Sequence, residues 1–220
     1  NFAALQGPPK DASLITGVLE DDYQVLPVKR IRNQTKQEME KFFSIELRDE
    51  VRANKIKSLV IWFAGHGKFI NDVGYWIPVD ARRDEEFTYF SLNTLRASME
   101  TYMNYLTHVL VITDACESGP SFYQAMRSEV KTRNCADWRA TQFKSSQIFS
   151  SAGYELAVDD SQFTRTFAST LRGNPNTCIS IDEIVLHVTK AVAGNNQQKP
   201  RFGKITGLKD EDGTFFFVKK

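Results

Sequence analysis

A histidine and a cysteine, each placed directly after a short apolar run, are the residues of this sequence best suited to covalent chemistry. The run 58–64 is followed by Gly-His-Gly, with His66 at its centre, and the run 108–113 is followed by Asp-Ala-Cys, ending at Cys116. A thiol is a good nucleophile once deprotonated, and an imidazole can take up its proton and later return it to a leaving amine. The backbone N–H groups of Gly67 and Cys116 could hold the oxyanion that such an attack creates.

The elements that carry these residues follow from the apolar pattern. Runs 58–64 and 108–113 are short, apolar and followed by turn-forming residues, which is typical of buried strands. Weaker strand candidates are 24–28, 75–79, 147–151 and 214–218. Helices are predicted after the capping boxes at 35–38 and 180–183, and less firmly over 91–104 and 163–171.

Strands that alternate with helices predict an α/β fold with a mostly parallel sheet. The two fully apolar strands, 58–64 and 108–113, are expected at the centre of that sheet, covered on both faces. Ligands bind beyond the carboxyl ends of such strands, which is where His66 and Cys116 would meet.

Each of these residues also has an ordinary structural interpretation. A cysteine after a strand is commonly a small buried apolar residue, and a histidine beside glycine is commonly part of a turn. Their joint position favours a site. His108 and His187 lie within predicted elements and are interpreted as structural, and Cys135 and Cys178 are interpreted as bystanders.

Composition excludes several classes of protein. The chain has 220 residues, enough for one domain spanning 1–220, and its net charge of +1 gives no case for nucleic-acid or membrane-surface binding. No apolar run is long enough to cross a membrane, and the N-terminus does not resemble a signal peptide. Three scattered cysteines predict neither a disulfide framework nor a metal site. A cytoplasmic protein is expected.

One long polar stretch, 117–146, is predicted to be an exposed loop and a possible processing region, because it is rich in basic residues. A second loop is predicted over 194–200.

The order of these motifs resembles the caspase-like (clan CD) cysteine peptidases, most of all metacaspases, paracaspases and bacterial CHAT-domain proteases. In that family a strand ends in His-Gly and the catalytic cysteine follows about 50 residues later, as His66 and Cys116 do. The segments 74–80, 150–153 and 163–164 also resemble family segments in the same order. The resemblance implies a three-layer α/β/α sandwich and a cysteine endopeptidase with a Cys116–His66 dyad.

The resemblance also implies cleavage after Arg or Lys, because metacaspases and paracaspases share the Asp-x-Cys arrangement of Asp114 and Cys116. A carboxylate two residues before the nucleophile lies on the same side of a strand end and can pair with a basic side chain. Asp11 matches a second family acid after Leu5-Gln-Gly7, and Glu155 a third. Alternatively, Asp11 caps a helix and Glu155 is solvated.

Three departures from the family pattern matter. Ala64 stands where metacaspases often have serine, and no acids match their calcium site, so neither a metal nor another cofactor is expected. The family's first central strand precedes the segment that Leu5-Gln-Gly7 resembles, and the sequence has no room for it. A regulatory domain or partner chain is therefore expected to supply that strand and to activate the enzyme.

Two other functions fit the pattern less well. A catalytically silent caspase-like scaffold would have no chemical need for both His66 and Cys116. A doubly wound nucleotide-binding domain would suit the α/β pattern, but neither GxGxxG nor GxxxxGK[ST] occurs in the sequence.

Overall fold

A four-stranded sheet forms the centre of the computed structural model, which describes residues 2–115, 133–151, 161–192 and 199–220. The strand order is β1-β5-β6-β8, with β1, β5 and β6 parallel and β8 antiparallel to β6. The bounds are β1 Ser58–Gly65, β5 His108–Ala115, β6 Ser145–Ser150 and β8 Arg201–Lys204. The predicted α/β class with a mostly parallel sheet is confirmed.

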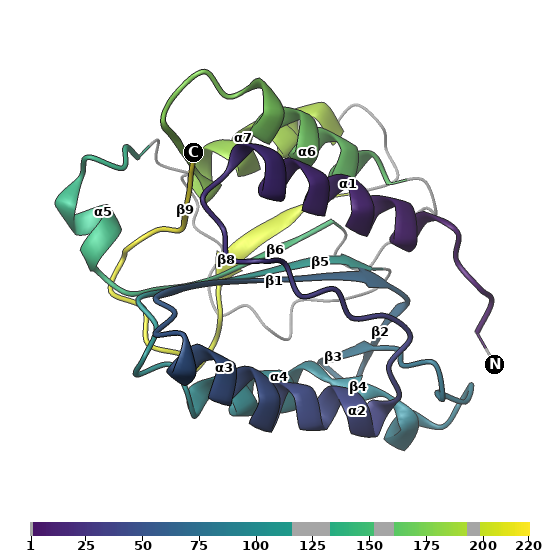
Figure 1. Ribbon diagram of the computed structural model, residues 1–220. Coiled ribbons are helices and arrows are strands. Elements are labelled where there is room, and N and C mark those ends of the chain that lie inside the picture. Colours follow the sequence, from purple (N-terminus) through teal and green to yellow (C-terminus); the bar gives the residue numbers. More distant parts are fainter. Residues whose placement is uncertain (1, 116–132, 152–160, 193–198) are drawn as a thin grey trace.

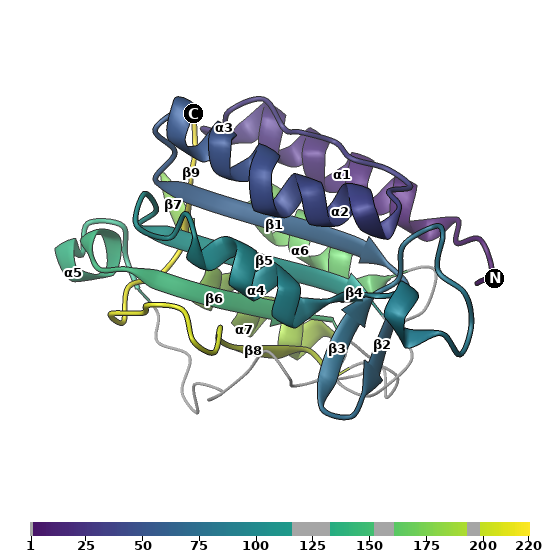
Figure 2. The same ribbon diagram turned by 90° about the horizontal axis from the view of Figure 1, so that it is seen from below.

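Helices cover both faces of this sheet, as Figures 1 and 2 show. One face carries α1 Gly7–Asp22, α6 Gln162–Gly173 and α7 Ile181–Val192; the other carries α2 Lys36–Lys41, the π-helical turn η1 Phe42–Glu46, α3 Leu47–Ala53 and α4 Leu92–Glu100. Each face has its own apolar core. Thr35 and Glu38 form the predicted capping box at the start of α2.

The central strand β5 is buried along its whole length, as predicted. Successive side chains of a strand point to opposite faces. Leu110 and Ile112 accordingly enter the core under α1, α6 and α7, whereas Val109 and Val111 enter the core under α2–α4. Asp114 continues the first series, so the pleat directs its carboxylate toward the α6 side.

The prediction that run 58–64 lies at the centre of the sheet is wrong. Its strand, β1, is an edge strand that pairs with β5, and most of its residues are only half-buried. The strand predicted over 24–28 is also absent: this described segment is extended without strand pairing, and Val25 and Leu26 are exposed. Among the described residues, β1 has β5 as its one partner strand, and the backbone of 24–28 bonds another backbone only through the Gln24 N–H, which donates to the Val218 carbonyl.

Two smaller sheets complete the fold. One contains β2 Gly67–Ile70, β3 Val73–Trp76 and β4 Phe90–Ser91, and the other pairs β7 Cys178–Ser180 with β9 Phe216–Val218. Asn71 and Asp72 join β2 to β3 with φ of 48° and 62°, as a two-residue hairpin turn of this kind requires. The short helical elements are the 3₁₀ turn η2 Glu86–Thr88 and the helix α5 Trp138–Gln142.

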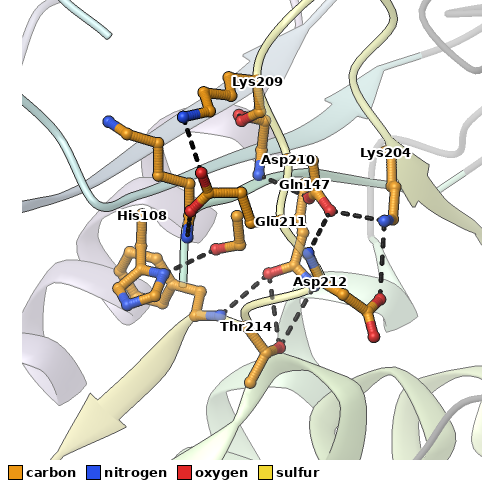
Figure 3. Close-up of polar contacts among 12 residues, drawn as sticks. His108, Gln147, Lys204, Lys209, Asp210, Glu211, Asp212 and Thr214 are labelled. Carbon is orange, nitrogen blue, oxygen red and sulfur yellow. Dashed lines mark hydrogen bonds and ion pairs between the residues drawn. The ribbon is translucent and has the colours of Figure 1, made fainter. Parts of the chain in front are cut away.

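Near the amino ends of β5 and β6, a polar network ties the 204–214 loop to the sheet (Figure 3). Asp210 accepts hydrogen bonds from the backbone N–H groups of Ser146 and Asp212 and pairs with Lys204 at 2.5 Å. The Gln147 side chain accepts from the Phe215 N–H and donates to Thr214. These polar groups satisfy one another, so this end of the sheet is structural.

A disulfide joins Cys135 to Cys178, with Cα atoms 6.4 Å apart and a sequence separation of 43. The interpretation of these cysteines as bystanders is therefore wrong. A crosslink over a loop of this length stabilises a fold by about 3–4 kcal/mol. Disulfides persist best in oxidising compartments. The cytoplasmic location stays a prediction from the sequence.

The predicted loop 117–146 contains ordered structure in its described part, 133–146. The helix α5 lies there, and Arg133 forms an ion pair with Asp212. Residues 116–132 lie outside the described residues, as does most of the predicted 194–200 loop. In the described ranges, no helix combines the length and apolarity needed to cross a membrane.

His108 is expected to make folding stability depend on pH. Its ring bonds Ser145 Oγ at 2.9 Å and the Thr141 carbonyl at 2.8 Å, and burial lowers its pKa below the usual 6.5. The unfolded chain therefore binds the proton more readily, and His108's contribution to stability, complete above pH 6.5, is lost as the pH falls through the window below it. Urea unfolding between pH 5 and 8 measures this loss.

The control is His108→Gln, whose amide can still donate to Thr141 but does not titrate. The difference in unfolding free energy between wild type and this variant should shrink as the pH is lowered. A difference that stays constant across the range would contradict the assignment.

Candidate functional site

His66 follows β1 at the carboxyl end of the sheet, and its ring is held by the N-terminal segment. Nε2 lies 2.7 Å from the Ala3 carbonyl oxygen, and the Phe2 ring packs against the imidazole at a centroid distance of 5.5 Å. A carbonyl oxygen can only accept a hydrogen bond, so Nε2 carries the proton. In the neutral ring, Nδ1 then has the free lone pair that a general base needs.

The segment that bears Ala3 is itself anchored by aromatic contacts. Phe2 packs edge-on against Tyr89 at 5.8 Å, and the Arg83 guanidinium lies over the Phe2 ring at 5.9 Å. Sequence reasoning missed Ala3 because its contribution is a backbone oxygen, which leaves no signature in residue type.

Gly67 begins β2, and its backbone N–H points away from β3. The Ile77 N–H donates to the His66 carbonyl, so these two residues form a hydrogen-bonded pair. Such pairs alternate with non-bonded pairs in an antiparallel ladder, so the backbone groups of the next pair, Gly67 and Trp76, point away from each other. This geometry suits the predicted role of Gly67 as an oxyanion donor.

Asp114 lies at the end of β5 and is only 7% exposed. One carboxylate oxygen, Oδ2, accepts a 2.6 Å hydrogen bond from Thr164 Oγ1 of α6. Among the described residues, no Lys, Arg or His forms an ion pair with this carboxylate. A buried carboxylate with a neutral partner is costly, so the site suits a cation brought by a ligand.

Two further polar groups near these strand ends are buried without a hydrogen-bond partner among the described residues. Ser151 directly follows β6, and its N–H donates to the Thr113 carbonyl, one residue before Asp114. Ser161 precedes α6, three residues before Thr164. Hydroxyls of this kind could accept hydrogen bonds from a bound ligand.

Of the other two predicted acids, only Asp11 belongs to the described residues. Asp11 lies half-buried on α1, which packs beside α6 (Figure 1), so it belongs to the same layer as Thr164. Its role as a second wall beside Asp114 stays a prediction. Glu155 and Cys116 lie outside the described residues. Within the described ranges, no cluster of His, Cys, Asp and Glu is arranged to hold a metal ion.

The segment 74–80, one of those that carried the resemblance, braces the site instead of lining it. The Trp76 indole N–H donates to Thr113 Oγ1 at 3.1 Å, on the sheet face opposite Asp114. The Asp80 carboxylate accepts from the Lys36 N–H at the start of α2. The Trp76 bond fixes the hairpin that begins at Gly67 against the end of β5, and the Asp80 bond ties the segment after the hairpin to α2.

Comparison with solved structures finds a likeness to a chain described as "structure of pro-sf-caspase-1". The match has a TM-score of 0.57 and 14% sequence identity, and it covers 96% of this chain and 83% of that one. No family model matches the sequence, and no curated protein matches it. The fold is therefore caspase-like, a sheet with mostly parallel strands between two helical layers.

The His66 tautomer can be tested directly. We expect the ¹⁵N chemical shifts of the neutral imidazole to show a protonated Nε2 and an unprotonated Nδ1, because the Ala3 carbonyl needs a donor. Removing residues 1–4 should lower the Nε2–H fraction of His66 toward that of the exposed His187. A predominant Nδ1–H tautomer in the intact chain would contradict the geometry, and the exposed His187 provides the internal reference.

Proposed function

We propose that this chain is a cysteine endopeptidase that cleaves proteins after Arg or Lys, with Cys116 as the nucleophile and His66 as the general base. The observation that carries the proposal is the register of the two strands. β1 and β5 pair in step from Ser58 and His108 to Gly65 and Ala115. His66 directly follows β1 in sequence, and Cys116 directly follows β5. Covalent connectivity therefore limits how far either residue can lie from the carboxyl edge of the sheet.

In the first step, Nδ1 of His66 takes the proton from the Cys116 thiol. The sulfur attacks the scissile carbonyl carbon, a C–S bond forms, and the carbonyl π electrons move to the oxygen. The Gly67 N–H is directed off its hairpin and can stabilise this oxyanion, together with the N–H of Cys116.

In the second step, the tetrahedral intermediate collapses and the C–N bond breaks, while the imidazolium gives its proton to the leaving amine. Water then attacks the thioester with His66 as base, and the acid product and free thiol are released. The Ala3 carbonyl holds Nε2 through both proton transfers, which fixes the ring orientation.

The preference for Arg or Lys rests on Asp114. Its carboxylate is buried beside the strand end and has Thr164 as a neutral partner, so a guanidinium or ammonium group would supply the missing positive charge. We propose Asp11 and Glu155 as additional acids of the same pocket.

Substituting Cys116→Ala should abolish hydrolysis of fluorogenic peptides ending in Arg or Lys. His66→Ala should lower kcat by at least about 100-fold, as expected for loss of a general base. His187→Ala, which changes an exposed histidine on α7, is the matched control and should leave the rate unchanged.

Peptides ending in Asp test the pocket in the same assay. Preference for Asp would keep the peptidase and overturn the role of Asp114. Hydrolysis that persists in purified Cys116→Ala would overturn the nucleophile, and an inert wild type would favour a scaffold.

We propose that the protein activates itself by cleaving its own chain in the part of the predicted processing region before residue 133. In the described part, the Arg133 side chain is 9% exposed and ion-paired, and Lys144 donates to the carbonyls of Met103 and Leu106. Arg139 lies within α5. Basic residues tied into the fold in this way are poor cleavage sites, which leaves Arg127 and Lys131 as the better candidates.

We also propose that a strand supplied by a regulatory domain or partner chain pairs with the outer edge of β1. The Lys57 carbonyl accepts hydrogen bonds from the N–H groups at the start of β5. Because the backbone groups of successive residues in a strand point to opposite sides, those of Val60, Trp62 and Ala64 point away from β5. The segment 24–34 runs alongside this edge in Figures 1 and 2, without a backbone hydrogen bond to β1 in the described structure.

Hydrogen exchange tests this pairing. In residues 1–220 alone, the amides of Val60, Trp62 and Ala64 should exchange much faster than those of β5. In a complex with the regulatory domain or partner chain that supplies the strand, they should become protected. Equal exchange of these amides in the two samples would contradict the proposal.

A further inference from the structure

We infer that Thr164 is a positioning residue that holds the Asp114 carboxylate ready for a cationic side chain, and so sets the affinity of the pocket for Arg and Lys. This inference deepens the proposed function and rests on it for the identity of the substrate. The cation site itself can be tested without proteolysis.

The contact joins two elements that are firmly fixed. Thr164 is fully buried in the first turn of α6, and its Oγ1 lies 2.6 Å from Asp114 Oδ2 at the end of β5. The neighbouring residue Phe163 packs against Phe149 of β6 at 4.7 Å, and Phe167, one turn later, packs against Trp62 of β1 at 5.0 Å. The hydroxyl is therefore presented from a rigid surface.

The hydroxyl of Thr164 behaves differently from those of other helical serines and threonines. Several of them donate to a backbone carbonyl three or four residues earlier in the chain, as Ser13, Thr16, Ser44, Ser169 and Thr170 do. That local bond is the usual one for a hydroxyl in a helix. Thr164 instead donates across the layer boundary to a carboxylate.

This bond has a specific consequence for ligand binding. Because Oδ2 is occupied by Thr164, the carboxylate cannot rotate freely, and Oδ1 remains for the N–H groups of a guanidinium. A pocket that is ordered before binding loses less entropy when the ligand arrives. Val has nearly the shape of Thr but no donor, so Thr164→Val removes the bond with little change in packing.

Benzamidine, a planar cation that resembles an arginine side chain, is the probe. Binding is measured by NMR titration on wild type, Thr164→Val, Thr164→Ser and Asp114→Asn. The matched control is Thr170→Val, which removes a hydroxyl from the same helix that bonds only the Thr166 carbonyl. Unfolding curves of all variants are recorded, and Thr164→Ala replaces the valine variant if that one does not fold.

We expect Thr164→Val to weaken benzamidine binding about 10-fold, the effect of one hydrogen bond to a charged group. Thr164→Ser and Thr170→Val should stay within about 3-fold of wild type, and Asp114→Asn should abolish binding. In peptide hydrolysis, Thr164→Val should raise KM for Arg substrates and leave kcat nearly unchanged, a split that a merely structural role would not produce.

Wild-type affinity in Thr164→Val would overturn the inference, as would equal losses in Thr164→Val and Thr170→Val or the absence of benzamidine binding to wild type. If benzamidine binding follows the expected order while no peptide is cleaved, the inference stands and the proposed peptidase function fails. The two failures are therefore distinguishable.

Discussion

The parallel pairing of β1 with β5 is the constraint on which the rest of the site depends. It runs in step from Ser58 and His108 to Gly65 and Ala115, and so brings the two chain segments that follow to one edge of the sheet. Three contacts lie near that edge: Trp76 bonds Thr113 on one face, Thr164 bonds Asp114 on the other, and the Ala3 carbonyl orients His66. The chemistry proposed for Cys116 and His66 would fail if the register slipped by one residue, because each side chain would then move to the opposite face.

The two ends of the sheet differ in how their polar groups are satisfied. At the amino end, Asp210 has Lys204 and two backbone N–H groups as partners, and the Gln147 side-chain amide both accepts and donates a hydrogen bond. At the carboxyl end, Asp114 has a neutral hydroxyl, and the Ser151 and Ser161 hydroxyls have no partner in the described structure. Buried polar groups are normally paired. The carboxyl end is therefore the part of the sheet whose buried polar groups are less completely satisfied within the described structure, as we propose for a ligand site.

Local patterns predicted much of this fold, because local chemistry determines those parts. The apolar run of β5, the Thr35–Glu38 capping box and the apolar stripe of α7 are signals carried by neighbouring residues. The edge position of β1, the disulfide between Cys135 and Cys178 and the bond from Thr164 to Asp114 join residues distant in sequence, and no local pattern contains them. The contact of Ala3 with His66 could not be predicted from residue type at all, because a backbone carbonyl makes it.

The most direct test of the central claim, that Cys116 and His66 form a dyad beside an acidic pocket, is covalent labelling followed by mass spectrometry. Wild-type protein is treated with acyloxymethyl ketones of matched peptides ending in Arg or in Asp, and the modified residue is identified. The Arg reagent should modify Cys116 much faster than the Asp reagent, and His66→Ala should abolish the reaction. Faster labelling by the Asp reagent, or labelling of Cys116 that is unaffected by His66→Ala, would contradict the central claim.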